Sequence, residues 1–164
     1  MTQPGVRPPV AAALATVGYF ALLVAALGVA SLLLEQEVIA TEGLGNLPGV
    51  VAAGLSTLAV LGVLLLALRG PQPSYAVAVI VMVVALLAYL VGLWFGAVFA
   101  GESLALAASA AGAFVLSWFG AILAVVAFIA GWVGVALVRT RAERPHWPWE
   151  SGDDGRRPDD DGQL

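Results

Sequence analysis

The stretch from Val10 to Leu34 reads VAAALATVGYFALLVAALGVASLLL and contains no charged residue. A helix rises about 1.5 Å per residue, so about 20 residues cross the ~30 Å hydrocarbon core of a bilayer. This stretch is therefore long enough to span a membrane with some tilt. A cleavable signal peptide is the competing interpretation, and it would leave three spans in the chain. However, a signal peptide has an apolar region of only ~7–15 residues.

Three further apolar stretches follow along the chain, and we expect a membrane-spanning helix from each, over residues 49–68, 75–99 and 113–138. The segment between Arg69 and Tyr75 is short and rich in Pro and Gly, so the second and third helices should be antiparallel neighbours. The Ala- and Ser-rich stretch 104–112 is only mildly apolar, and we interpret it as an interfacial or outer extension of the fourth span.

The composition supports the same fold class. Hydrophobic residues make up 61% of the chain and charged residues 11%, whereas a soluble domain carries roughly a quarter charged residues. The sequence therefore predicts an all-α integral membrane bundle of four transmembrane helices. A nucleic-acid-binding protein would need a basic face, and this chain has none. The chain also has no cysteine, which excludes disulfides and thiolate metal sites.

The charges predict how the bundle is oriented. With both termini in the cytoplasm, the two outer loops contain only acids, namely Glu35, Glu37 and Glu42 in the first and Glu102 in the second. All the positive charge then lies inside, as the positive-inside rule requires. The arginines concerned are Arg7, Arg69, Arg139, Arg141, Arg144, Arg156 and Arg157. We therefore expect a multi-pass protein of the plasma membrane with both termini cytoplasmic.

The chain divides into three parts. Residues 1–9 are a cytoplasmic leader, residues 10–138 form the transmembrane domain, and residues 139–164 form a cytoplasmic segment that we expect to be disordered after Trp149. The start of this last segment is basic and aromatic, and it predicts an anchor at the inner membrane interface. A docking motif for a cytoplasmic partner is the alternative. The anchor residues are Arg139, Arg141, Arg144, Trp147 and Trp149.

Small residues repeat along the fourth predicted span at alternating steps of four and three. This spacing keeps them on one helix face, where close approach of backbones and dispersion contacts drive helix association in lipid. The seam packs either inside the monomer or against a second copy or another subunit. Its residues are Ala113, Ser117, Gly120, Ala124, Ala127, Gly131 and Gly134.

The first and third spans carry shorter small-residue faces. The small-residue face of the first span comprises Gly18, Ala21, Ala25 and Gly28. The face of the third span includes the pair Gly92 and Gly96. Hydroxyl side chains within spans most often bond to their own helix. Those of Ser117, Ser56 and Thr57 are the candidates for a bridge between helices.

The four spans contain no Asp, Glu, Lys, Arg or His. Ionisable residues inside a membrane mark proton relays, ion paths and substrate sites. We therefore expect no proton-coupled transport, no haem or other cofactor and no intramembrane hydrolysis. His146 is the only histidine and has no second ligand nearby, so we expect no metal site either.

Four spans in so short a chain are similar to the small multidrug exporters. Those exporters depend on a membrane-embedded glutamate in the first helix, and residues 10–34 contain none. Four-helix quinone reductases of the disulfide-linked type need cysteines, which are missing here. The sequence therefore indicates no family, and the architecture alone does not assign a function.

These observations lead to a functional hypothesis. We expect a non-catalytic membrane protein that is an accessory or scaffolding subunit or a homo-oligomer, and not an enzyme. Its partners would be the lipid bilayer and, through the fourth helix, another membrane protein or a second copy. A carrier for an uncharged or lipid-like solute is the alternative, because an apolar path between helices needs no charge.

Overall fold

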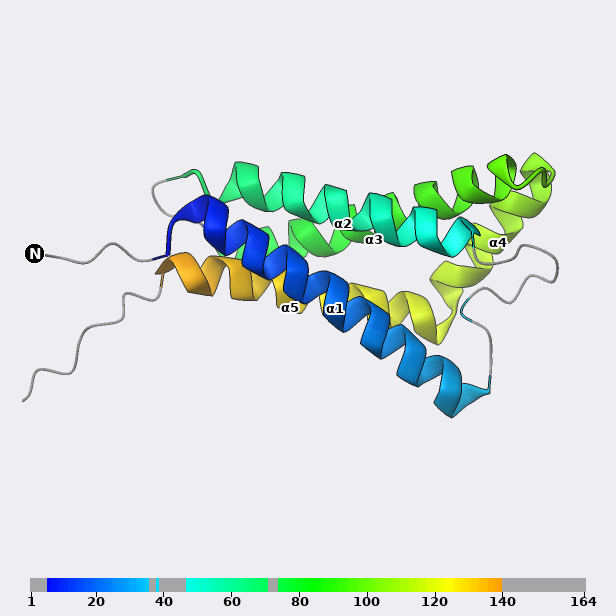
Figure 1. Cartoon of the computed structure of the whole chain (residues 1–164), viewed down its shortest axis with the longest axis horizontal. Helices are drawn as coiled ribbons and strands as arrows, with labels where there is room; N and C mark the ends of the chain where they lie inside the picture. Colours follow the sequence, from blue (N-terminus) through cyan, green and yellow to red (C-terminus); the bar gives the residue numbers. More distant parts are fainter. Residues whose placement is uncertain (1–5, 36–37, 39–46, 71–73, 140–164) are drawn as a thin grey trace, which may run out of the picture.

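Five helices make up the regular structure of the chain in a computed structural model that describes residues 6–35, 38, 47–70 and 74–139. Within these residues the structure contains helices and no strand, which confirms the predicted all-α class. The predicted tail, residues 140–164, lies outside them. The helices are α1 (Pro8–Leu34), α2 (Leu47–Ala67), α3 (Ala76–Phe99), α4 (Leu104–Leu116) and α5 (Trp118–Arg139) (Figure 1).

Four of these helices are long and apolar enough to cross a membrane, as the sequence predicts. They are α1, α2, α3 and α5, with 27, 21, 24 and 22 residues. At about 1.5 Å per residue even the shortest is about 32 Å long, which matches the ~30 Å of hydrocarbon. Pro8 and Pro9 occupy the first positions of α1, where a missing N–H costs nothing, and Glu35 ends that helix in the left-handed conformation (φ 50°).

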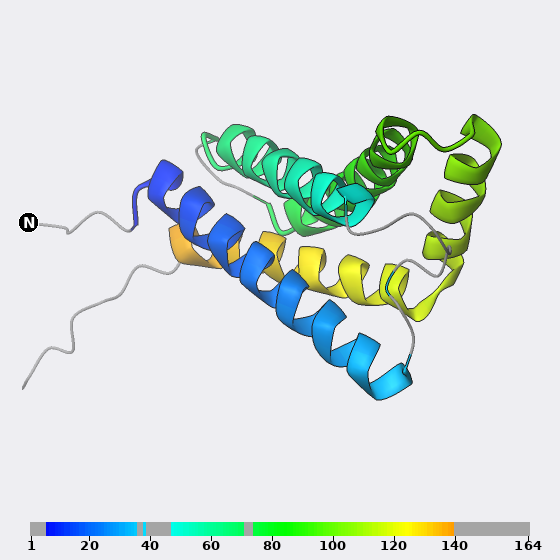
Figure 2. The ribbon, with the colours of Figure 1, turned by 45° about the vertical axis from the view of Figure 1, so that its right-hand side comes forward.

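The helices pack around α3, which contacts α2, α4 and α5, while α1 lies against α5 and α2. Figures 1 and 2 agree that the starts of α1 and α3 and the ends of α2 and α5 lie at one end of the bundle. At the opposite end α4 runs obliquely from the end of α3 to the start of α5 (Figure 2). Because α2 and α3 are antiparallel neighbours, the arrangement agrees with the short connection seen in the sequence.

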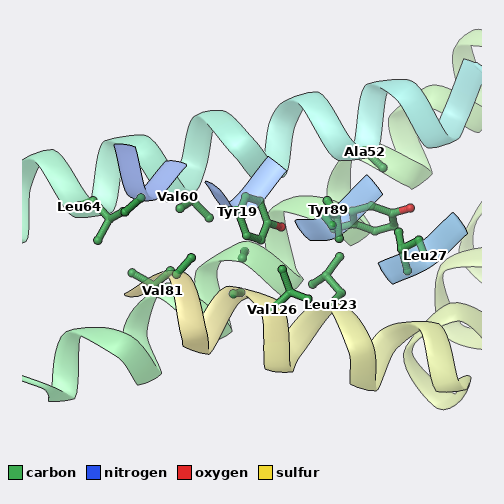
Figure 3. Packing of buried hydrophobic residues seen from close by; sticks show 14 of the residues in the cluster. Tyr19, Leu27, Ala52, Val60, Leu64, Val81, Tyr89, Leu123 and Val126 are labelled. Atoms are coloured by element: carbon green, nitrogen blue, oxygen red, sulfur yellow. The ribbon is translucent and has the colours of Figure 1, made fainter. Parts of the chain in front are cut away.

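Buried side chains recur at every fourth residue of α2, at Ala52, Ser56, Val60 and Leu64. Side chains from α1, α3 and α5 meet this row in the middle of the bundle (Figure 3). The outward faces are also apolar. In α1, for example, Leu32 is 81% exposed. An apolar surface of this extent is what a helix facing lipid requires.

The fourth apolar stretch differs from the expected single helix over residues 113–138. The helix breaks at Ser117, whose backbone is extended (φ −85°, ψ 163°), so α4 ends at Leu116 and α5 begins at Trp118. The Ser117 hydroxyl donates a 2.7 Å hydrogen bond to the carbonyl of Phe114, a local bond that competes with helix continuation. With 13 residues, α4 is too short to span, whereas α5 is long enough alone.

Gly120 permits the corner between α4 and α5. A Cβ added at Gly120 would lie 2.7 Å from the carbonyl oxygen of Phe114 and 2.9 Å from that of Val115. Backbone atoms cannot move aside as the end of a side chain can. A side chain at this position is therefore incompatible with the observed corner.

The Gly120→Ala substitution should destabilise the protein by about 1–3 kcal/mol, the usual effect of overpacking. Gly112→Ala on α4 is the matched control, because a Cβ there meets nothing within 4 Å and alanine favours the helix. The measurement is the midpoint of unfolding when the purified protein is titrated with SDS in mixed micelles. Equal midpoints for the two variants would contradict the corner described here.

Candidate functional site

The residues of the predicted seam fall on two helices and the break between them. Ala113 lies on α4 and is exposed, and Ser117 forms the break. The other five lie on α5, where Gly120, Ala127, Gly131 and Gly134 are buried and Ala124 is half-buried.

Two glycines of the seam lie in close contact with neighbouring helices, Gly131 with a backbone atom and Gly134 with side chains. A Cβ at Gly131 would lie 2.7 Å from the Cα of Ala78 in α3. One at Gly134 would lie 3.1 Å from a methyl carbon of Leu64 in α2 and 3.4 Å from the Cβ of Ala15 in α1. This part of the seam therefore packs inside the bundle, where the missing side chains let α5 approach three helices at once.

The glycine pair of α3 forms an equally close contact with α2. A Cβ at Gly92 would lie 2.6 Å from the Cα of Ala52, and one at Gly96 would lie 2.6 Å from the Cα of Pro48. Both distances are shorter than any contact that a real Cβ makes. Consequently α2 and α3 touch through their backbones over the end of the bundle that carries α4.

The small-residue face of α1 is placed differently. Ala21, Ala25 and Gly28 are exposed and Gly18 is half-buried. A Cβ added at either glycine would meet nothing within 4 Å. Unlike the close-packed glycines of α3 and α5, the two glycines of this face have open space around them.

A chain of hydrogen bonds connects α1, α2 and α3 in the core. The hydroxyl oxygens of Tyr19 and Ser56 are 2.6 Å apart, and the Ser56 Oγ is 2.9 Å from the carbonyl oxygen of Ala85. A carbonyl can only accept, so Ser56 donates to Ala85 and Tyr19 donates to Ser56. Tyr19 and Ser56 are both fully buried, and their polar atoms are thus satisfied without water.

Of the three hydroxyls that the sequence offers as bridges, only Ser56 bonds across helices. Thr57 donates to the carbonyl of Ala53 in its own helix, and Ser117 donates to Phe114 in the preceding turn. Sequence analysis missed the contribution of Tyr19. The available signal was a tyrosine in mid-span, because a buried tyrosine hydroxyl usually finds a partner.

Aromatic contacts occur in the middle of the bundle and at one of its ends. Tyr89 of α3 stacks on Phe114 of α4, with ring centroids 4.6 Å apart, and so attaches the short helix to the core. At the end of the bundle where α1 begins, the guanidinium carbon of Arg139 lies 5.0 Å from the centre of the Tyr75 ring and over it. Tyr75 in turn stacks on Trp132 at 6.2 Å. Aromatic rings and arginines at one level are typical of a membrane interface.

Of the predicted inner anchor, the structure describes Arg139, which is exposed at the end of α5. Arg141, Arg144, Trp147 and Trp149 lie outside the described residues. The charged residues that are described stand at helix ends or in connections: Arg7, Glu35, Arg69, Glu102 and Arg139. No group of three or more metal-ligating side chains occurs in the described part of the chain.

The Tyr19–Ser56 bond can be tested with a double-mutant cycle of Tyr19→Phe and Ser56→Ala. We expect a coupling energy of about 0.6 kcal/mol, and at most ~1.7 kcal/mol, which is the range for hydrogen bonds between membrane helices. The measurement is the free energy of unfolding in SDS-containing micelles. Thr57→Ala is the control, because that hydroxyl bonds within α2 and should show no coupling to Tyr19→Phe. Additive effects of the two core substitutions would argue against the bridge.

Comparison with known proteins identifies one family. The model of the family of unknown function DUF6121 matches residues 7–157, so the chain belongs to this family. No curated protein and no solved structure gives a significant match.

Proposed function

We propose that this member of the DUF6121 family is a non-catalytic integral protein of the plasma membrane that acts as an accessory or scaffolding subunit or as a homo-oligomer. The observation that carries the proposal is the exposed small-residue face of α1. Small faces of α3 and α5 are in direct contact with neighbouring helices, as Gly92 and Gly131 illustrate. A face of the same kind that is left open on α1 favours a partner helix outside the monomer.

The geometry of α1 supports this assignment. At about 100° per residue, Gly18, Ala21, Ala25 and Gly28 fall within a sector of about 80°. The bulky buried residues of α1, such as Tyr19 and Leu23, lie on the opposite side of the helix. Large side chains thus attach α1 to the bundle, and its small side chains are free to receive another helix.

The proposed orientation has the arginine end of the bundle in the cytoplasm. Arg7, Arg69 and Arg139 lie at the end where α1 begins and α2 and α5 end, and Glu35 and Glu102 lie at the other (Figure 1). Positive residues next to spans favour the cytoplasmic side. This orientation puts both termini inside.

The orientation can be tested with single cysteines, because the natural chain has none. Ser103→Cys lies at the α4 end of the bundle and Ser74→Cys at the arginine end, and both positions are exposed. In intact cells an impermeant maleimide should label the cysteine at position 103. The cysteine at position 74 should react only after the membrane is permeabilised. The reverse pattern would refute the proposed orientation.

The role of α1 can be tested by a tagged pull-down from native membranes in mild detergent, with mass spectrometry of the eluate. Wild-type protein should elute with a stoichiometric partner or as a homo-oligomer. Gly28→Leu should lose that association and still fold, because position 28 has open space around it. Gly62→Leu on α2 is the matched control, since its surroundings are equally open.

Elution of the wild-type chain alone, as a monomer, would rule out the proposal. Retention of the partner by Gly28→Leu would exclude the α1 face as the contact. In the first case the alternative is a carrier for an uncharged or lipid-like solute. It would be examined by flux into proteoliposomes compared with empty liposomes.

A further inference from the structure

Three arginines from three helices gather at one end of the bundle. Arg7 precedes α1, Arg69 follows the end of α2, and Arg139 is the last residue of α5. All three are exposed. In both ribbon views these helix ends lie at the same end of the molecule (Figures 1 and 2). The acids among the described residues, Glu35 and Glu102, lie at the opposite end.

The contacts of Gly134 show that the three arginines also lie at similar depth. Gly134 faces both Leu64 of α2 and Ala15 of α1. Arg139 follows Gly134 by five positions, and Arg69 follows Leu64 by five. Arg7 precedes Ala15 by eight. At about 1.5 Å per residue these offsets are about 7.5 Å and about 12 Å along the helices. Along the helices, the backbones of the three arginines therefore differ in depth by only about one helical turn.

The side chain of Arg139 is already oriented in the structure. Its guanidinium lies over the ring of Tyr75, and Tyr75 stacks on Trp132. Arginine generally places the flat face of its guanidinium on an aromatic ring. The N–H groups along its edge remain available for a phosphate, which they can bind in bidentate geometry.

Apolar side chains continue from the arginines toward the middle of the helices. Val10 and Leu14 on α1 are 47% and 55% exposed, and Leu66 on α2 is 70% exposed. A free phosphate ion would make no use of these surfaces. An amphiphile with an anionic head and acyl chains would contact both the arginines and the apolar side chains next to them.

We propose that Arg7, Arg69 and Arg139 form a binding site for the headgroup of an anionic phospholipid, with its acyl chains along the adjoining apolar faces. Basic groups between helices at the membrane surface are suited to such headgroups. The site does not depend on the partner proposed for α1. It would persist in a protein that proves to be monomeric.

The test is a titration of the purified full-length chain in detergent, followed by native mass spectrometry. The probes are phosphatidylglycerol, phosphatidylcholine of the same acyl chains, and inorganic phosphate. Phosphatidylglycerol should bind in preference to phosphatidylcholine. Arg7→Gln, Arg69→Gln and Arg139→Gln should each weaken its binding about five-fold, the factor that corresponds to about 1 kcal/mol per arginine.

Ser103→Asp is the matched control, because it lowers the net charge by the same amount at the opposite end of the bundle, where position 103 is exposed and aspartate also caps α4. A five-fold loss in this control as well would overturn the site in favour of diffuse attraction between charges. Equal binding of the two lipids, or displacement of the lipid by inorganic phosphate, would also overturn it. If Arg139→Gln does not fold, Tyr75→Leu should weaken lipid binding and Tyr75→Phe should retain it.

Discussion

Contact between helix backbones at glycine positions is the constraint on which the rest of this structure depends. Gly92 and Gly96 bring α3 against α2, and Gly131 brings α5 against α3. Lipid chains are as apolar as leucine side chains, so burial from water does not hold helices together inside a bilayer. Dispersion contacts over short distances must do so, and they require that side chains be absent where the backbones meet.

The hydrogen-bonded chain in the core depends on this close packing. A serine side chain is short, and Ser56 reaches the carbonyl of Ala85 at 2.9 Å because α2 and α3 touch nearby. The touching residues are Ala52, about one turn from Ser56, and Gly92, about two turns from Ala85. Tyr19 then reaches Ser56 from α1, because the tyrosine side chain is long enough to cross a wider gap. The three helices are thus joined by two directional hydrogen bonds in a largely apolar core (Figure 3).

The sequence predicts the helices well because long uncharged stretches leave few alternatives in lipid. It does not predict the break at Ser117, since a repeat of small residues is compatible with a continuous helix and the local bond to Phe114 is decided by three-dimensional context. For the same reason Ala113 is separated from the remainder of the seam. The pairing of Tyr19 with Ser56 joins residues 37 positions apart, and no local pattern encodes it.

Comparison of α1 with α5 indicates what a small-residue pattern can specify. Both helices carry glycine and alanine along one face, but α5 directs Gly131 and Gly134 into the bundle, whereas α1 leaves Gly28 exposed. The pattern therefore identifies a surface that allows close approach without identifying what approaches it. Whether the small-residue face points into the bundle or away from it is decided by the side chains on the opposite face of the same helix. In α1 that face carries Tyr19, Leu23 and Leu27, which fill the core, and Tyr19 also makes a hydrogen bond, so α1 is attached to the bundle by its larger side chains.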